Sequence, residues 1–157
     1  MGALSQLNIV IRYLFMEDLT SADYRALAGF RLEVRRFLHF SESAARDENL
    51  EPQQHQMLLA IRALSDAEAP TVGQLADHLM VRHHSAVGLV DRLEQRDLVE
   101  RTRGAADRRQ VRVQLTPKGE GKLHRLASIH RAELLTSGPR LVAALHTVLE
   151  GKYEPVR

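Results

Sequence analysis

Cysteine is absent from the 157 residues of this chain. Without thiols the protein can form no disulfide, no thiolate metal site and no cysteine-based redox switch. Aromatic residues make up only 4% of the sequence, so there is no platform of rings on which single-stranded nucleic acid or RNA could stack. The lack of cysteine fits a cytoplasmic protein, which is the location we expect.

Motifs of catalysis are missing as well. The sequence contains no glycine-rich phosphate loop, no G-x-S-x-G and no H-E-x-x-H, and its carboxylates are scattered over predicted exposed faces. We therefore expect no enzymatic activity and no cofactor. Of the eight histidines, no two lie four residues apart on one helix, so no metal site is expected. A zinc site assembled between helices, for instance from His39 and His55 with a carboxylate, remains an alternative.

The positive charge is concentrated in one part of a chain that has the length of a single domain. The formal charge is +2, but the segment from Arg82 to Arg125 holds eleven Lys and Arg against six Asp and Glu. This segment therefore carries +5 and the remainder −3. A local basic segment of this kind indicates a phosphate-bearing partner.

A helix-turn-helix is predicted between Thr71 and Glu94. Thr71 and Gln74 have the spacing of a capping box, in which each side chain satisfies a backbone N–H at the start of a helix. After a break from Met80 to His83, a second helix is predicted from Ser85, because apolar residues recur at helical spacing. These apolar residues are Val87, Val90 and Leu93. The residues left at the N-terminal end of this helix, where a helix-turn-helix contacts base edges, are His83, His84 and Ser85.

A β-hairpin is predicted directly after the second helix. Its first strand includes Leu98–Thr102, and its polar tip, Arg103–Arg109, contains a glycine. In the returning strand, Val111, Val113 and Leu115 alternate with polar residues, which is typical of a half-buried strand. Arginines at such a tip can follow a phosphate backbone or enter a minor groove. The sequence thus predicts a mainly α fold with a small β-hairpin wing, a winged helix-turn-helix.

This segment resembles the MarR-type family of bacterial transcription regulators. The matching motifs are Leu75-Ala76-Asp77-His78-Leu79, Val90-Asp91-Arg92-Leu93-Glu94 and Leu98-Val99-Glu100-Arg101. The matching wing signature consists of Asp107, Arg109, Val113, Leu115, Thr116 and Gly119. The resemblance extends over about residues 24–150 and implies a dimeric, DNA-binding protein whose terminal helices form the dimer.

At two positions the residue is not the type that the family or a helix would favour. Asp97 stands where the family often has glycine, at a helix end that favours a left-handed backbone, which aspartate tolerates better than most residues. Gly88 lies inside the second helix, where glycine costs about 1 kcal/mol relative to alanine. Close approach to DNA or a packing constraint would explain it.

Two helices are predicted before the helix-turn-helix. The first runs from Tyr24 to about Arg46 and is amphipathic. Its apolar face contains Leu27, Phe30, Val34, Phe37, Leu38 and Ser41. The next begins at Pro52, because the first position of a helix needs no N–H, and Asp66–Pro70 ends it. Its inner face contains Met57, Leu58, Ile61 and Leu64.

Two more helices are predicted after the wing. Thr116 caps the first and Pro117 begins it, and it extends to about Thr136. Its apolar residues are Leu123, Leu126, Ile129 and Leu134. Ser137–Pro139 is predicted to break the chain before a final helix. The apolar residues of that final helix are Leu141, Leu145, Val148 and Leu149.

These helices suggest a single MarR-like domain over residues 21–157, with a DNA-binding lobe at 52–116. The dimerisation helices, at 21–47 and within 117–150, are apolar enough to need a partner. We expect this partner to be a second copy of the chain. A homodimer would place two recognition helices about one turn of DNA apart on a pseudo-palindromic operator. Packing of these helices within one chain is the alternative. Residues 1–20 are expected to be an N-terminal extension, with Met16 as the natural start.

The predicted site residues fall into two groups. The candidates for contact with double-stranded DNA are Thr71, Arg82, His83, His84, Ser85, Arg103, Asp107, Arg108 and Arg109. Among them we expect Arg109 to enter the minor groove, Asp107 to fix the wing, and Arg103 and Arg108 to contact phosphate.

The resemblance also implies a small-molecule effector, often an aromatic or phenolic anion, bound near the first, second and fifth helices of the family fold. The residues at those places are Phe37, His39, His55 and Leu59. We expect a repressor that such an effector releases from DNA. A winged helix that binds a protein partner, or a metal-responsive regulator, is the alternative.

Overall fold

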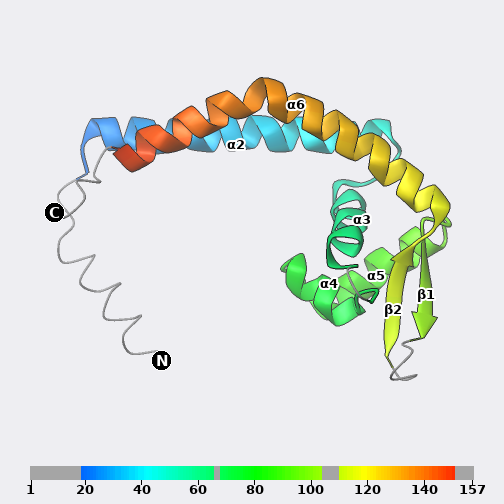
Figure 1. Cartoon of the computed structure of the whole chain (residues 1–157). Helices are drawn as coiled ribbons and strands as arrows, with labels where there is room; N and C mark the ends of the chain where they lie inside the picture. Colours follow the sequence, from blue (N-terminus) through cyan, green and yellow to red (C-terminus); the bar gives the residue numbers. More distant parts are fainter. Residues whose placement is uncertain (1–18, 66–67, 104–109, 151–157) are drawn as a thin grey trace, which may run out of the picture. The chain divides into compact units, whose positions relative to one another are not determined.

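The structure is a computed structural model that describes residues 19–65, 68–103 and 110–150 (Figure 1). In chain order the elements are α2 (Ser21–Asp47), α3 (Pro52–Leu64), α4 (Val72–His78), α5 (His83–Glu94), β1 (Val99–Arg103), β2 (Val111–Leu115) and α6 (Pro117–Glu150). The predicted fold class, mainly helical with a hairpin wing, is confirmed. The chain divides into two compact units, one formed by Leu38–Thr136 and the other by the segments on either side of it. The predicted extension lies almost wholly outside the described residues.

The helices α4 and α5 form the predicted helix-turn-helix. Thr71 caps α4 as expected, because its Oγ1 accepts from the Gln74 N–H at 3.3 Å while its own N–H donates to Gln74 Oε1 at 2.9 Å. The recognition helix α5 begins at His83, two residues before the predicted start. Its N-cap, Arg82, makes no side-chain capping bond; the Arg82 carbonyl instead accepts from the N–H groups of Ser85 and Ala86. His83 and His84 therefore lie in the first helical turn.

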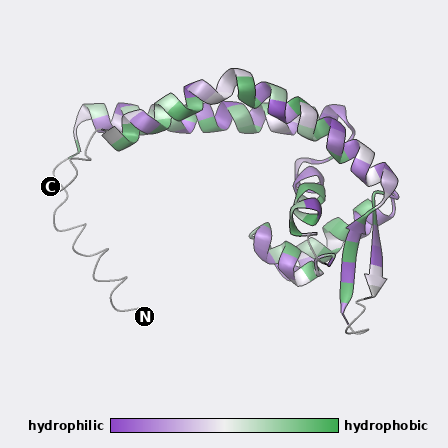
Figure 2. Cartoon of the chain, viewed as in Figure 1, coloured by the Kyte–Doolittle hydropathy of each residue, from purple (hydrophilic) through white to green (hydrophobic). Residues whose placement is uncertain are grey.

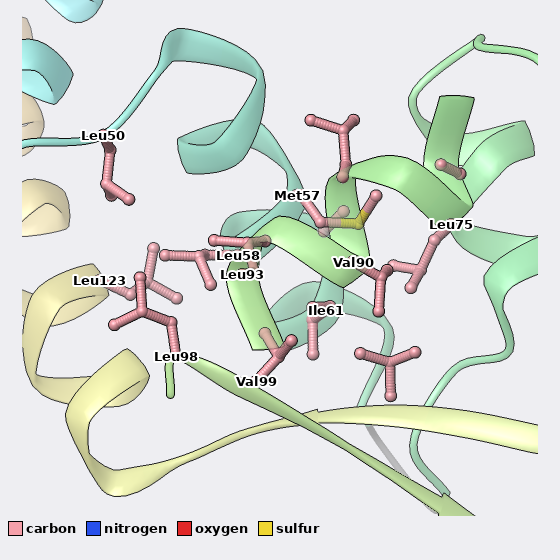
Figure 3. Close-up of a cluster of buried hydrophobic side chains, with 14 of the residues drawn as sticks. Leu50, Met57, Leu58, Ile61, Leu75, Val90, Leu93, Leu98, Val99 and Leu123 are labelled. Atoms are coloured by element: carbon pink, nitrogen blue, oxygen red, sulfur yellow. The ribbon is translucent and has the colours of Figure 1, made fainter. Parts of the chain in front are cut away.

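The core of the winged lobe is made of aliphatic side chains from every one of its elements (Figure 3). Leu58 and Ile61 of α3, together with Leu93 of α5, are fully buried. Others in the cluster are Leu50, Met57, Leu75, Val90, Leu98, Val99, Val113, Leu123 and Leu126. Since burying one such side chain contributes about 1.5–3 kcal/mol, this cluster is the main source of stability of the lobe.

The wing is an antiparallel hairpin in which Val99 pairs with Leu115 and Arg103 with Val111. The segment before α4 adds a short third edge, because the Val113 N–H donates to the Pro70 carbonyl at 2.9 Å. The predicted alternation holds near the core, where Val113 is buried. It is lost toward the tip, where Val111 is 44% exposed because the hairpin has left the core.

Three helices end at a residue with a left-handed backbone that is not glycine. These residues are Asn49, Met80 and Asp97, with φ angles of 57°, 53° and 57°. Asp97 follows α5, where the sequence predicted this conformation, and the prediction is confirmed. Directly after it, the Leu98 N–H donates to the Leu93 carbonyl at 3.0 Å and closes the helix end.

The start of α6 is fixed against the turn after α5. As predicted, Thr116 caps the helix: its Oγ1 accepts from the Gly119 N–H at 3.0 Å and donates to the Asp97 carbonyl at 2.7 Å. Gly119 packs directly on this turn. A Cβ atom at position 119 would lie 1.9 Å from the Leu98 carbonyl oxygen, so only glycine fits there.

The predicted break at Ser137–Pro139 is wrong, because α6 continues without interruption from Pro117 to Glu150. The helical φ angle suits proline, and Pro139 removes only one backbone donor from the helix. The residue before a proline is disfavoured in a helix partly because of its Cβ, and Gly138 has none. Its position is also open, with no atom within 4 Å of where a Cβ would stand.

The predicted apolar face of α2 is only partly covered. Ser41 is buried and Phe30, Val34 and Phe37 are half-buried, whereas Leu27 and Leu38 are 40% and 47% exposed. Green apolar positions alternate with purple polar ones along both α2 and α6 (Figure 2). Among the described residues, no helix has the length and apolar character needed to cross a membrane.

Candidate nucleic-acid interface

The N-terminal end of the recognition helix is open to solvent. Arg82, His83, His84 and Ser85 are all exposed. The first N–H groups of a helix have no intrahelical partner and carry the positive end of the helix dipole, so this end attracts phosphate. The structure therefore presents these predicted residues together, while their contact with DNA stays a prediction.

The opposite face of α5 anchors the helix. Ala86, Leu89, Val90 and Leu93 are buried, at 0–3% exposure, and belong to the core cluster. These residues follow the spacing of one helical face, which leaves His84, Ser85 and Arg92 on the outward side. The exposed surface is thus carried by a helix that the core holds in place.

Gly88 belongs to the outward side, since it follows His84 by four residues. A Cβ at position 88 would meet only Arg92 Nη1, at 3.5 Å, which is an ordinary contact with the end of a flexible side chain. The described residues therefore provide no packing reason for glycine. Close approach of the α5 backbone to DNA stays a prediction.

We expect Gly88→Ala to raise the free energy of unfolding by up to about 1 kcal/mol, because alanine favours the helix. The same methyl group should weaken binding to duplex DNA if the backbone of α5 lies against it. Gly29→Ala in α2, where a Cβ would stand in open space, is the control for helix stabilisation alone. Denaturant unfolding and duplex titration measure both effects. Unchanged duplex affinity in Gly88→Ala would place this face outside the interface.

A trough of about 700 Å³ separates the recognition helix from the wing. We call it the wing trough; it is formed by the first turn of α4, the first half of α5 and the two strands. Its walls include Thr71, Gln74, His83, Val87, Arg101 and Arg112. Thr71, a predicted contact residue, is half-buried there and already uses its hydroxyl oxygen as the α4 cap.

Both arginines of the wing trough have partners inside the protein. Arg112 Nη1 donates to the Ala69 carbonyl at 2.7 Å and Nη2 pairs with Glu68. Arg101 pairs with Asp91 and Glu94 of α5. Local sequence patterns do not predict these pairings, because period two alone places Arg112 facing solvent. The only available signal was the spacing of Asp91 and Glu94, which puts two carboxylates on one face.

The remaining predicted DNA contacts lie at the wing tip. Arg103 is the last residue of β1. Asp107, Arg108 and Arg109 lie outside the described residues, so their assigned roles stay predictions. The cationic residues that the sequence assigned to DNA are therefore Arg82 next to α5 and the arginines of the tip.

The four candidate effector residues have different surroundings. Leu59 is 43% exposed and lies in the wall of a pocket of about 600 Å³ between α3 and the first turns of α6. Other residues of this pocket are Arg62, Pro117, Glu120, Leu123 and His124. His39 is exposed, and Phe37 belongs to the unit formed by the terminal segments.

His55, the fourth candidate, is a core residue at 4% exposure. Its ring stacks on that of His130 in α6, with the centroids 4.8 Å apart. His130 is held by the Leu126 carbonyl and by Ser41 Oγ, at 2.6 and 2.8 Å from its ring nitrogens. Burial, and secondarily the neighbouring His130, lower the pKa of His55 to about 4. His55 is therefore uncharged near neutral pH and packs as part of a three-helix junction.

No three His, Asp or Glu side chains come together in an arrangement that could hold a metal ion, within residues 19–65, 68–103 and 110–150. The zinc alternative based on His39 and His55 gains no support from their surroundings, since one is exposed and the other is stacked in the core.

Comparison with known proteins gives the class of this fold. The MarR family model matches residues 48–110. The chain is 40% identical over 50 residues to the uncharacterized HTH-type transcriptional regulator YsmB of Bacillus subtilis. That match covers 32% of this chain and 34% of the relative, so it spans about a third of the relative's length.

Two solved structures give the same fold. One is a mutant of S. aureus MepR bound to an oligodeoxyribonucleotide, with a TM-score of 0.63, 20% identity, and 85% of this chain and 99% of that chain covered. The other concerns the regulation of DNA binding of Bordetella bronchiseptica BpsR by 6-hydroxynicotinic acid, with a TM-score of 0.59, 21% identity, and coverage of 80% and 91%.

The lobe from α3 to β2, with its capped α4, anchored α5 and paired wing strands, defines a winged helix-turn-helix protein. Within this class, residues 48–110 match the MarR family model, and the matched curated relative is an HTH-type transcriptional regulator. The resemblance predicted from the sequence is confirmed.

Proposed function

We propose that this protein is a cytoplasmic, homodimeric transcription regulator that binds a pseudo-palindromic operator in double-stranded DNA and represses until a small molecule releases it. The observation that carries the proposal is that the N-terminal end of α5 is exposed while the opposite face of the helix is buried in the core. A helix end of this kind is suited to entering the major groove. The +5 charge of the segment from Arg82 to Arg125 supports the same partner.

The dimer is supported by apolar side chains that the single chain leaves exposed. In α2 these are Tyr24, Leu27 and Leu32, at 61%, 40% and 47% exposure. Near the end of α6 they are Val142, Leu145 and Leu149, at 54%, 40% and 57%. Large apolar side chains exposed along a helix favour an interaction site, and a second copy of the chain offers the same surface in return.

The effector would occupy the pocket between α3 and α6 that contains Leu59. Its walls combine the apolar Leu115 and Leu123 with the cationic Arg62 and with His124. An aromatic or phenolic anion matches this combination, since its ring would lie on the leucines and its charge next to the arginine. Release requires that the protein already samples DNA-binding and non-binding states and that the effector favours the second.

The test of DNA binding is a titration of the protein with the duplex upstream of its own gene and with a scrambled duplex, across a salt series. A preference of ~10³-fold or more for the native duplex, which weakens steeply with salt, would support a specific regulator. A duplex selected from a random-sequence pool serves the case in which the operator lies elsewhere. Equal and weak binding to every duplex would instead favour the winged helix as a protein-binding module.

We expect Arg109→Ala to weaken operator binding by about 1–3 kcal/mol if this side chain enters a groove. The control is Arg46→Ala in α2, an exposed arginine paired with Glu42 at 3.2 Å, which removes the same charge away from the wing. Both variants should unfold at the same denaturant concentration as the parent. Operator affinity that is unchanged in a folded Arg109→Ala protein would remove this residue from the interface.

A further inference from the structure

Two acidic residues lie on one face of the recognition helix. Among the described residues of α5, no basic side chain forms an ion pair with either of them. Asp91 and Glu94 are three residues apart, so their carboxylates are adjacent. Both stand in the C-terminal half of α5, where the helix dipole disfavours negative charge. Two like charges at this end destabilise the helix unless a cation from another element is placed between them.

Arg101, in the first strand of the wing, supplies this cation. Its Nη2 donates to Asp91 Oδ1 and its Nη1 to Glu94 Oε2, while its backbone N–H donates to Glu94 Oε1 at 3.3 Å. The side chain is 27% exposed. Burial lowers the pKa of Arg101, but the bond to Asp91 and the charges of both carboxylates outweigh burial and raise it, so the group stays charged.

We propose that Arg101 is a positioning residue for operator binding: it fixes the wing strand β1 to the recognition helix α5 and so sets where the wing meets DNA. This inference rests on the proposed DNA-binding function. The planar guanidinium can reach two carboxylates at once, which a lysine cannot do with the same geometry. The three motif residues Asp91, Glu94 and Arg101 thereby have one shared role that involves no contact with DNA.

Direct contact between Arg101 and phosphate is the competing explanation, because Arg101 also lines the wing trough. The two roles differ in their dependence on salt. Loss of a phosphate contact lowers the slope of log affinity against log salt by about one for each protomer. When a positioning contact is lost, the wing must be ordered during binding, so affinity falls. The bound wing still contacts the same phosphates, so the slope is unchanged.

The experiment compares Arg101→Gln, Arg101→Lys and the parent in binding to the duplex upstream of its own gene, or to a pool-selected duplex, across a salt series. We expect Arg101→Gln to lose roughly tenfold in affinity with an unchanged salt slope, within the range of coupling inside one ion-pair network. Arg101→Lys should recover only part of it. Arg46→Gln is the charge-matched control and should bind like the parent.

A double-mutant cycle provides the second arm. In a chain that already carries Asp91→Asn and Glu94→Gln, replacing Arg101 with glutamine should change affinity by much less than in the parent, since its partners are gone. A lower salt slope together with an equal loss in both backgrounds would overturn the proposal in favour of a phosphate contact. Affinity unchanged by Arg101→Gln would overturn it as well.

A readout without DNA separates this inference from the proposed function. Amide hydrogen exchange of Val99–Arg103 and Val111–Leu115 in the free protein should become faster in Arg101→Gln and stay unchanged in Arg46→Gln. If the parent prefers no duplex, the proposed function fails while the exchange result still decides whether Arg101 fixes the wing. Unchanged exchange in both strands would overturn the role of Arg101 whatever the DNA result.

Discussion

Gly119→Ala should reduce the free energy of unfolding by about 3 kcal/mol or more, at the upper end of the cost of overpacking a well-packed site. The new Cβ would stand 1.9 Å from the Leu98 carbonyl oxygen and 2.9 Å from its carbon, and both are backbone atoms that cannot rotate away. The start of α6 would have to move off the turn after α5. This movement would also stretch the bond from the Thr116 N–H to the Leu98 carbonyl, now 3.2 Å long. Denaturant unfolding measures the loss.

Gly121→Ala is the matched control for this variant. It lies two residues further along α6, and a Cβ there would meet only Arg125 Nη1, at 3.8 Å. It should leave stability unchanged or raise it by up to about 1 kcal/mol through helix propensity. If Gly119→Ala were as stable as Gly121→Ala, the close packing of α6 on Leu98 would be contradicted.

Acid should destabilise the protein before its carboxylates are protonated. The pKa of His55 is about 4 in the folded chain, against 6.5 as its ordinary value, because the ring is buried and stacked on His130. The unfolded chain therefore binds more protons between these values, and stability is lost as the pH falls through this range. Between pH 7 and pH 5 the loss amounts to about 2 kcal/mol. Denaturant unfolding at a series of pH values measures it.

His55→Gln should lack this part of the pH dependence, whatever its stability at neutral pH. His39→Gln, which replaces an exposed histidine, should keep the full slope of the parent. Glu48, whose pKa is lowered through its bonds to Arg125 and Lys122, affects stability only at lower pH, as its ordinary pKa is 4.5. Parallel stability curves for the parent and His55→Gln would contradict the assignment.

The helix starts and ends were predictable wherever a single local residue determines them. The capping pair Thr71 and Gln74, the cap Thr116, the first helical residue Pro52 and the left-handed Asp97 act within a few residues of sequence. All of them occur as expected. The break predicted at Ser137–Pro139 was wrong, because a helix tolerates an internal proline when its other interactions outweigh the lost hydrogen bond.

The exposed residues of the site could be predicted from the sequence, whereas the ion pairs that hold its elements together could not. Helical spacing placed Val90 and Leu93 correctly on the buried face of α5, but it included the half-buried Val87 and missed Ala86 and Leu89. The open end that carries His83 and His84 was predicted. The pairing of Arg112 with Glu68 and of Arg101 with Asp91 depends on contacts between elements, which no local pattern records. Local patterns therefore gave Arg101 and Arg112 no role, whereas both hold elements of the lobe together.

The left-handed corner at Met80 has a consequence for how the protein can evolve. Such a backbone costs about 1–2 kcal/mol for most residues and less for asparagine and aspartate, so the corner between α4 and α5 is costlier than those at Asn49 and Asp97. A change to glycine would recover this energy without loss of packing, since the Met80 side chain is 92% exposed. The lobe thus has a reserve of stability next to its recognition helix. That reserve can offset destabilising substitutions at His83, His84 or Ser85, which under the proposed function would permit a change of operator preference.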